Sequence, residues 1–172
     1  MFLRLLSLFF VLSLVVLPFD LGAQSSDQKV TYKKARALQT STAKKIVKVV
    51  EALERVDEEG KEDPDFETVK EILNELLVKK DSLRSYDRSV MWNYWGYVYF
   101  SEERFSDAMQ AYRNLLAEPE STILLRVASL YTLAQLNFVN EDYEEGVKVL
   151  LQWMDEVEVI TCLLYTSDAA DE

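Results

Sequence analysis

Residues 91–116 read MWNYWGYVYFSEERFSDAMQAYRNLL, and most of the information about the fold lies in this stretch. Its bulky and small residues recur at the three- and four-residue spacing of helix faces, on either side of the polar residues Ser-Glu-Glu-Arg. Gly96 and Ala108 are small where two helices would cross closely, and the surrounding aromatic side chains would fill the remaining volume. The stretch therefore predicts a helix, a short turn and a second helix that packs back on the first.

The same pattern recurs downstream at a constant offset, which we call the period, and upstream at nearly the same offset. The second-helix residues Phe105, Ala108, Tyr112 and Leu115 correspond to Tyr143, Gly146, Leu150 and Trp153 downstream, and to Phe66, Val69, Leu73 and Leu76 upstream. The first-helix residues Trp92, Trp95 and Gly96 correspond to Leu130, Leu133 and Ala134, whereas Tyr99 becomes Asn137. We therefore predict an all-α chain of about three helical hairpins: a degenerate one at 41–80, a well-formed one at 85–118 and a degenerate one at 121–158.

This spacing resembles the tetratricopeptide repeat (TPR) family, in which helix-turn-helix units of about 34 residues stack into an α-solenoid. The period of this chain is longer, which implies longer connections between the units. The structural positions carried over from the family are Trp92, Trp95, Gly96, Tyr99, Phe105, Ala108, Tyr112, Leu115, Leu133, Ala134, Tyr143 and Gly146. The alternative is an ordinary array of amphipathic helical hairpins that lacks the geometry of the family.

The resemblance also implies a binding groove lined by the first helix of each unit. The groove positions are Asn93, Tyr97 and Phe100 in the central unit, and Tyr131, Gln135 and Phe138 in the next. Each set combines two aromatic residues with an amide, which suits a peptide with apolar anchors and backbone hydrogen bonds. Alternatively, Phe100 and Phe138 cover a neighbouring hairpin.

At a finer level, residues 36–157 are similar to exported TPR proteins of Gram-negative bacteria that are encoded with TonB-type energy-transduction systems. The similarity is strongest at Ser85-Tyr86, Met91-Trp92-Asn93, Tyr99, Leu133-Ala134-Gln135-Leu136 and Leu151-Gln152-Trp153. It implies a periplasmic scaffold with protein partners such as TonB, ExbB and ExbD. There are two alternatives: an adaptor for envelope assembly or peptidoglycan machinery, and the non-catalytic part of a larger enzyme. Neighbouring genes would distinguish a TonB-type scaffold from an envelope or peptidoglycan adaptor.

Both ends of the chain differ from its middle. Residues 1–23 have a basic start, an apolar run and a small-residue end, which predict a cleaved signal peptide, and residues 24–40 form a polar leader. The apolar run is shorter than a membrane-spanning helix requires. Residues 162–172 read CLLYTSDAADE and match the translation of a transposase-derived sequencing adapter. We expect this segment to be an artefact, and the natural chain to continue with further repeats.

The composition disfavours several classes of partner and of catalytic chemistry. The net charge of −11 disfavours nucleic acid and anionic membranes as partners, because both require a basic surface. The chain has no histidine, and its one cysteine, Cys162, lies in the suspected adapter segment. Ser-His-Asp catalysis, thiolate chemistry and histidine metal sites are therefore not expected, and we predict no enzymatic activity, no metal and no cofactor.

Helix boundaries follow from capping signals. We expect Thr40 or Ser41 to cap the first helix, which should reach about Glu58. The next helix should use Asp63 as its N-cap, with Pro64 at the first helical position. A helix from the cap at Ser121 or Thr122 to Phe138 and a last helix over 143–157 complete the expected set.

Overall fold

The computed structural model describes residues 37–168, with side chains described as far as Glu158. The expected signal peptide and most of the polar leader lie outside this range, and all the described residues belong to one compact unit, Lys33–Glu172. The described residues form α-helices and a short 3-10 helix without any strand, which confirms the all-α prediction. The elements are α2 (Thr40–Leu53), α3 (Phe66–Val78), η1 (Lys80–Ser82), α4 (Ser85–Ser101), α5 (Phe105–Leu116), α6 (Ile123–Val139) and α7 (Tyr143–Asp168).

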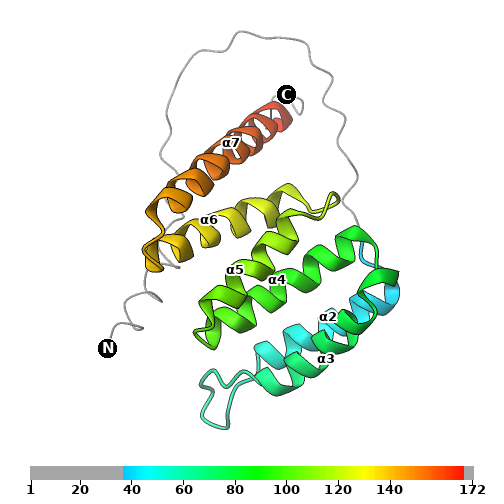
Figure 1. The fold of residues 1–172 in the computed structure, drawn as a ribbon. Helices are drawn as coiled ribbons and strands as arrows, with labels where there is room; N and C mark the ends of the chain where they lie inside the picture. Colours follow the sequence, from blue (N-terminus) through cyan, green and yellow to red (C-terminus); the bar gives the residue numbers. More distant parts are fainter. Residues whose placement is uncertain (1–36, 169–172) are drawn as a thin grey trace. The chain divides into compact units, whose positions relative to one another are not determined.

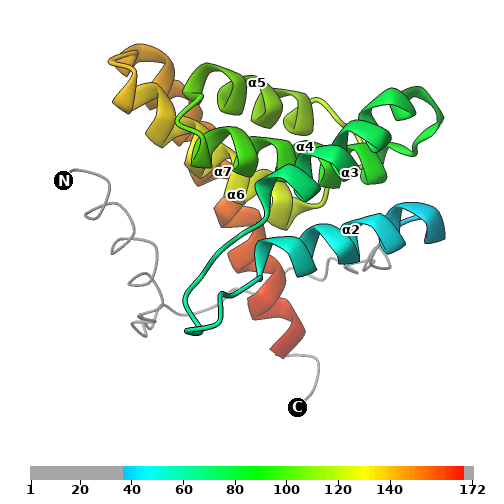
Figure 2. The ribbon, with the colours of Figure 1, turned by 90° about the horizontal axis from the view of Figure 1, so that it is seen from below.

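The helices pack mainly in sequential pairs, α2 with α3, α4 with α5 and α6 with α7. Each pair also contacts the next one, through α3 with α4 and through α5 and α4 with α6 (Figure 1). One apolar core lies mainly between α2, α3 and α4, and a second lies between α5, α6 and α7. Figure 2 shows the same hairpins from below.

The turns of the second and third hairpins have the same backbone geometry at equivalent positions. Glu103 and Glu141 both adopt the left-handed conformation, with φ of 60° and 61°. The amide of the next residue, Arg104 or Asp142, donates to the carbonyl of Tyr99 or Asn137, at distances of 2.8 and 2.9 Å. This pattern satisfies one of the last carbonyl groups of the first helix. The period found in the sequence is therefore also a period of the backbone.

The connection of the first hairpin is longer and has its own structure. The Asp57 carboxylate accepts hydrogen bonds from the amides of Glu59 and Lys61, both at 2.9 Å, and Gly60 has a φ of 79°. Val56 and Glu62 then form an isolated antiparallel bridge. Such side-chain bonds to the backbone compete with helix formation. The prediction that the first helix continues to Glu58 is therefore wrong, because it ends at Leu53.

Three further boundaries also differ from expectation. Gln39, rather than Thr40 or Ser41, is the N-cap of α2. The N-cap of α3 is Asp65, whose carboxylate accepts from the Thr68 amide at 3.0 Å, so Pro64 precedes the helix and Asp63 pairs with Arg55. Finally, α7 runs to Asp168, beyond the expected end at Val157. The cap at Thr122 is confirmed.

Candidate binding surface

The six predicted groove residues occupy matching positions on α4 and α6, but they are not equally accessible. Tyr97 and Tyr131 are 45% and 46% exposed, and Gln135 is also exposed. Asn93, Phe100 and Phe138 are half-buried. The accessible part of the candidate surface is therefore the set Tyr97, Tyr131 and Gln135.

Each exposed tyrosine lies against an aromatic ring from another helix. The Tyr97 ring centroid lies 6.3 Å from that of Phe66 on α3, and the Tyr131 centroid lies 5.3 Å from that of Trp153 on α7. These distances are typical of attractive aromatic pairs. The partner ring restricts the orientation of the tyrosine while part of its surface stays in solvent. A tyrosine fixed in this way loses little conformational freedom when it binds a ligand.

The two phenylalanines contribute mainly to packing within their own hairpins. A Cβ atom built on Gly146 of α7 would come within 2.7 Å of the Phe138 ring, so this ring covers the glycine directly. The Phe100 centroid lies 6.0 Å from that of Phe105, across the turn between α4 and α5. Both phenylalanines border the second core. These ring contacts lie within one hairpin each, which is neither the predicted groove contact nor the cover of a neighbouring hairpin.

The structural positions of the central hairpin lie in the core. Trp95 is only 4% exposed and its ring stacks on that of Tyr99 at 5.0 Å. The guanidinium of Arg104 lies 4.5 Å from the centre of the Tyr99 ring, in a cation–π contact. Gly96 faces the Tyr112 ring, which would lie 2.6 Å from an added Cβ. Trp95 therefore fills the core, and the half-buried Trp92 packs against the same core.

Burial and ion pairs shift several pKa values in and around this hairpin. Burial raises the pKa of the Tyr112 hydroxyl to about 12, with a smaller effect from nearby Tyr97. At the end of α4, a hydrogen bond from Lys70 of α3 lowers the pKa of the Glu102 carboxyl, and their atoms are 2.9 Å apart. Lys70 in turn has a raised pKa, first through Glu67 and then through Glu102. These shifts have structural causes and do not mark an acid–base site.

One repeated feature was not found from the sequence. The Nε and Nη2 groups of Arg88 each donate a hydrogen bond of 2.7 Å to the carboxylate of Glu118. Arg126 forms the corresponding pair with Glu156, in which its Nε donates to both carboxylate oxygens at 2.9 and 3.0 Å and its Nη2 donates to one of them. Both members of the second pair lie one period after those of the first. Each arginine joins the start of the first helix to the far end of its hairpin. The ion pairs could have been predicted from the sequence, because an arginine and a glutamate both recur one period apart.

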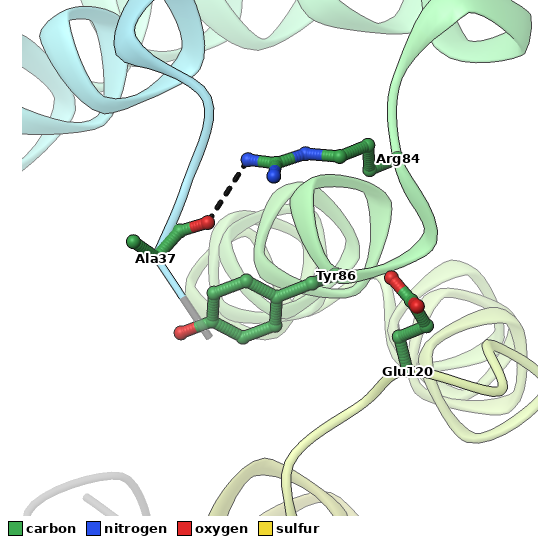
Figure 3. Close-up of a pocket in the computed structure, with 4 residues that line it drawn as sticks. All are labelled: Ala37, Arg84, Tyr86 and Glu120. Atoms are coloured by element: carbon green, nitrogen blue, oxygen red, sulfur yellow. Dashed lines mark hydrogen bonds between the residues drawn. The ribbon is translucent and has the colours of Figure 1, made fainter. Parts of the chain in front are cut away.

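The described residues form two shallow depressions that are not lined by the predicted groove residues. The first, of about 250 Å³, is lined by Ala37, Arg84, Tyr86 and Glu120 (Figure 3). There the Arg84 guanidinium donates to the Ala37 carbonyl at 2.9 Å. Arg84 also donates to buried Asp87, which accepts from the Gln39 amide at 2.8 Å. The second depression, near Arg126 and Glu156, is about 400 Å³. The contacts of the first depression hold the start of α2 against α4.

Among the residues whose side chains the structure describes, 37–158, no group of three potential ligands is placed to hold a metal ion. No helix in the described part of the chain has an apolar run long enough to cross a bilayer. The chain matches no protein-family model, no curated protein and no solved structure.

Proposed function

We propose that this protein is a periplasmic scaffold with TPR-type architecture, which binds peptide segments of partner proteins through the first helices of its hairpins. The observation that carries this proposal is the period of the sequence, which repeats the turn geometry and the arginine–glutamate pair from one hairpin to the next. Arrays of this kind bind extended segments along the surface of successive units. The exposed residues Tyr97, Tyr131 and Gln135 are the contact points.

The chemistry of this surface favours a peptide over a small molecule. Two half-exposed tyrosines offer apolar area together with a hydroxyl group, and Gln135 offers both a donor and an acceptor. Tyrosine is a frequent energetic centre of protein interfaces. None of these three residues lines either depression, so a ligand here would lie along the helices. The partners we propose are the periplasmic segments of TonB, ExbB and ExbD.

Fluorescence anisotropy with labelled peptides that tile these three segments tests the proposal. We expect one or more peptides to bind, and Tyr97→Ala and Tyr131→Ala to weaken the affinity by about tenfold or more, as for an interface centre. Val78→Ala is the control, because Val78 is 86% exposed on α3 and far from the proposed contacts in sequence. Circular dichroism should show that all three variants fold.

Two results would count against this function. If no TonB, ExbB or ExbD segment binds, the partner assignment is wrong, and envelope-assembly proteins become the next partners to test. If Tyr97→Ala instead unfolds the protein, the contact between Tyr97 and Phe66 is structural and the groove assignment fails.

A further inference from the structure

The outer side of α2 is basic, in a protein whose net charge is −11. Lys44 and Lys48 are exposed, and Val47, which is 56% exposed, lies beside them, because residues three and four positions apart share one side of a helix. The buried residues of the opposite side are Thr42, Ile46 and Val49. Figure 1 shows α2 and α3 side by side at one end of the series of helices. The two lysines therefore point away from the core.

The end of α3 enlarges this basic region. Lys45 of α2 pairs with Glu75 of α3, and Lys79 follows Glu75 by about one turn. Lys45 lowers the pKa of the Glu75 carboxyl through a hydrogen bond, and the charges of Lys79 and Lys48 lower it further. One carboxylate is therefore surrounded by three lysines. The border of the region, toward the connection between α2 and α3, carries the exposed residues Glu51 and Glu71.

Three lysines of this region, Lys44, Lys48 and Lys79, form no ion pair with any described residue. We call them, together with Val47, the basic surface. Five arginines elsewhere each pair with a carboxylate: Arg55, Arg84, Arg88, Arg104 and Arg126. Those arginines are neutralised within the fold, whereas the three lysines are not. A surface with uncompensated charge of one sign attracts partners of the opposite sign.

Neither the preceding residues of this chain nor a second copy is complementary to the basic surface. Residues 24–36 carry four basic side chains and one acidic side chain. Like charges repel, which disfavours this segment as the occupant. A second copy is disfavoured by its net charge of −11, because a large net charge of one sign keeps proteins monomeric. The charges therefore favour an acidic segment of a different protein.

A short acidic segment suits this surface better than an anionic membrane does. The connection that follows α2 holds four exposed acidic residues, Asp57, Glu58, Glu59 and Glu62. A flat anionic surface that approached α2 would also approach this connection and be repelled by it. A short peptide can contact the lysines without reaching the connection.

We propose that the outer side of α2 binds an acidic segment of a partner protein, with two carboxylates of the segment paired to Lys44 and Lys48 and an apolar side chain against Val47. The two lysines are about 6 Å apart along the helix, since each residue adds about 1.5 Å. Alternate residues of an extended segment lie on one side at about 6.5 Å, so acidic residues at alternate positions match this distance. This surface is separate from the contacts at Tyr97 and Tyr131, so either can fail without the other.

Fluorescence anisotropy of the whole chain with three labelled peptides tests the proposal. The first has glutamate at alternate positions around a leucine, and the other two replace its glutamates with glutamine or with lysine. We expect only the glutamate peptide to bind, and its binding to be lost at 1 M salt, where charges are screened beyond about 3 Å. Lys44→Glu and Lys48→Glu should each weaken the affinity about fivefold or more, because an attraction becomes a repulsion. Tyr97→Ala should not affect it.

Arg113→Glu on α5 is the matched control, because it makes the same change in net charge at another exposed cation without an ion pair. It should leave the affinity unchanged, and circular dichroism should show that all variants fold. Equal binding of the glutamate and glutamine peptides, or an equal loss of affinity in Arg113→Glu and Lys48→Glu, would overturn the proposal. So would binding to phosphatidylglycerol vesicles, or a concentration-dependent dimer in light scattering, that Lys48→Glu removes, because the occupant would then be a membrane or a second copy.

Discussion

The hairpins α4–α5 and α6–α7 share a backbone but differ in how they fill the space between their helices. In the first, Gly96 on the leading helix lies against the Tyr112 ring of the return helix. In the second, the glycine is Gly146 on the return helix, and it lies against Phe138 of the leading helix. A large and a small residue meet in both, but at different levels of the hairpin, because Phe138 and Gly146 match Phe100 and Ala108 of the first hairpin. Both hairpins therefore require close packing between their helices, and either helix can supply the ring.

A second difference involves three positions that change together. In the first hairpin Trp95 stacks on Tyr99, and Arg104 lies over the Tyr99 ring. The matching residues of the second hairpin are Leu133, Asn137 and Asp142. Loss of the aromatic stack thus coincides with loss of the cation that covers it. Asn137 is 1% exposed and its Nδ2 donates to the Leu133 carbonyl at 2.8 Å, but its Oδ1 has no partner among the described residues.

The largest expected effect comes from filling the glycine crossing of the first hairpin. Gly96→Leu should lower the free energy of unfolding by about 3 kcal/mol or more, because even its Cβ would overlap the Tyr112 ring. Urea denaturation measures this change. Ala128→Leu, at an exposed position of α6, is the control and should stay within about 0.5 kcal/mol of the wild type. A wild-type melting temperature for Gly96→Leu would refute the close crossing.

A second test replaces the interhelical contact residues of the first hairpin with their equivalents from the second hairpin. Ala134 and Leu150 stand in the second hairpin where Gly96 and Tyr112 stand in the first. Gly96→Ala alone should lower the free energy of unfolding by about 1–2 kcal/mol. The double variant Gly96→Ala, Tyr112→Leu should be about 1 kcal/mol more stable than the sum of the two single effects, because the two positions share their volume. Additive single and double variants would show that the two positions do not share their volume.

At high pH the first hairpin should weaken through Tyr112. Its pKa is about 12 in the folded protein and 10.0 in the reference state, so the buried neutral hydroxyl contributes fully below pH 10. That contribution is lost as the pH rises from 10 to 12, by up to about 2–3 kcal/mol. Unfolding at pH 9, 10 and 11 measures the loss, and Tyr112→Phe should reduce it. The pKa values of Tyr94 and Tyr99 are also raised by burial, so part of the dependence will remain.

Tyr143→Phe, at a tyrosine that is 62% exposed, is the control for the loss of a hydroxyl group. If Tyr112→Phe and the wild type lose stability equally between pH 9 and 11, the Tyr112 hydroxyl is accessible to solvent in the folded state.

The two arginine–glutamate pairs should contribute equally if the hairpins are equivalent in this respect. Arg88→Met and Arg126→Met should each lower the free energy of unfolding by about 1–2 kcal/mol, because each removes charge-assisted hydrogen bonds from a partly buried carboxylate. Lys148→Met is the control: that side chain is 63% exposed, and its loss should change stability by less than about 0.5 kcal/mol. If only one of the two arginine variants is less stable than the wild type, the two ion pairs contribute unequally to the free energy of unfolding despite their repeated geometry.

The sequence was informative where side-chain size alone determines the packing. The period, the helix order and the tight contact at Gly96 could all be predicted, because apolar spacing reports directly on helix faces. The end of α2 could not be predicted, since Asp57 and Gly60 form a turn that competes with helix. The accessibility of Phe100 and Phe138 was also beyond the sequence. It depends on how closely the return helix approaches, and therefore on residues such as Gly146 in another segment.

The smallest expected change has the opposite sign and concerns Asn137. A buried acceptor without a partner is unfavourable, and an apolar residue of similar size removes it, so Asn137→Leu should raise the free energy of unfolding by about 1 kcal/mol. Asn74→Leu, at an exposed position of α3, controls for helix propensity and should change stability little. A tyrosine would not restore the arrangement of the first hairpin, because Asp142 stands in the place of Arg104. If Asn137→Leu is instead destabilising, the amide has a partner in solution, and the second hairpin has replaced an aromatic stack with a polar contact of comparable strength.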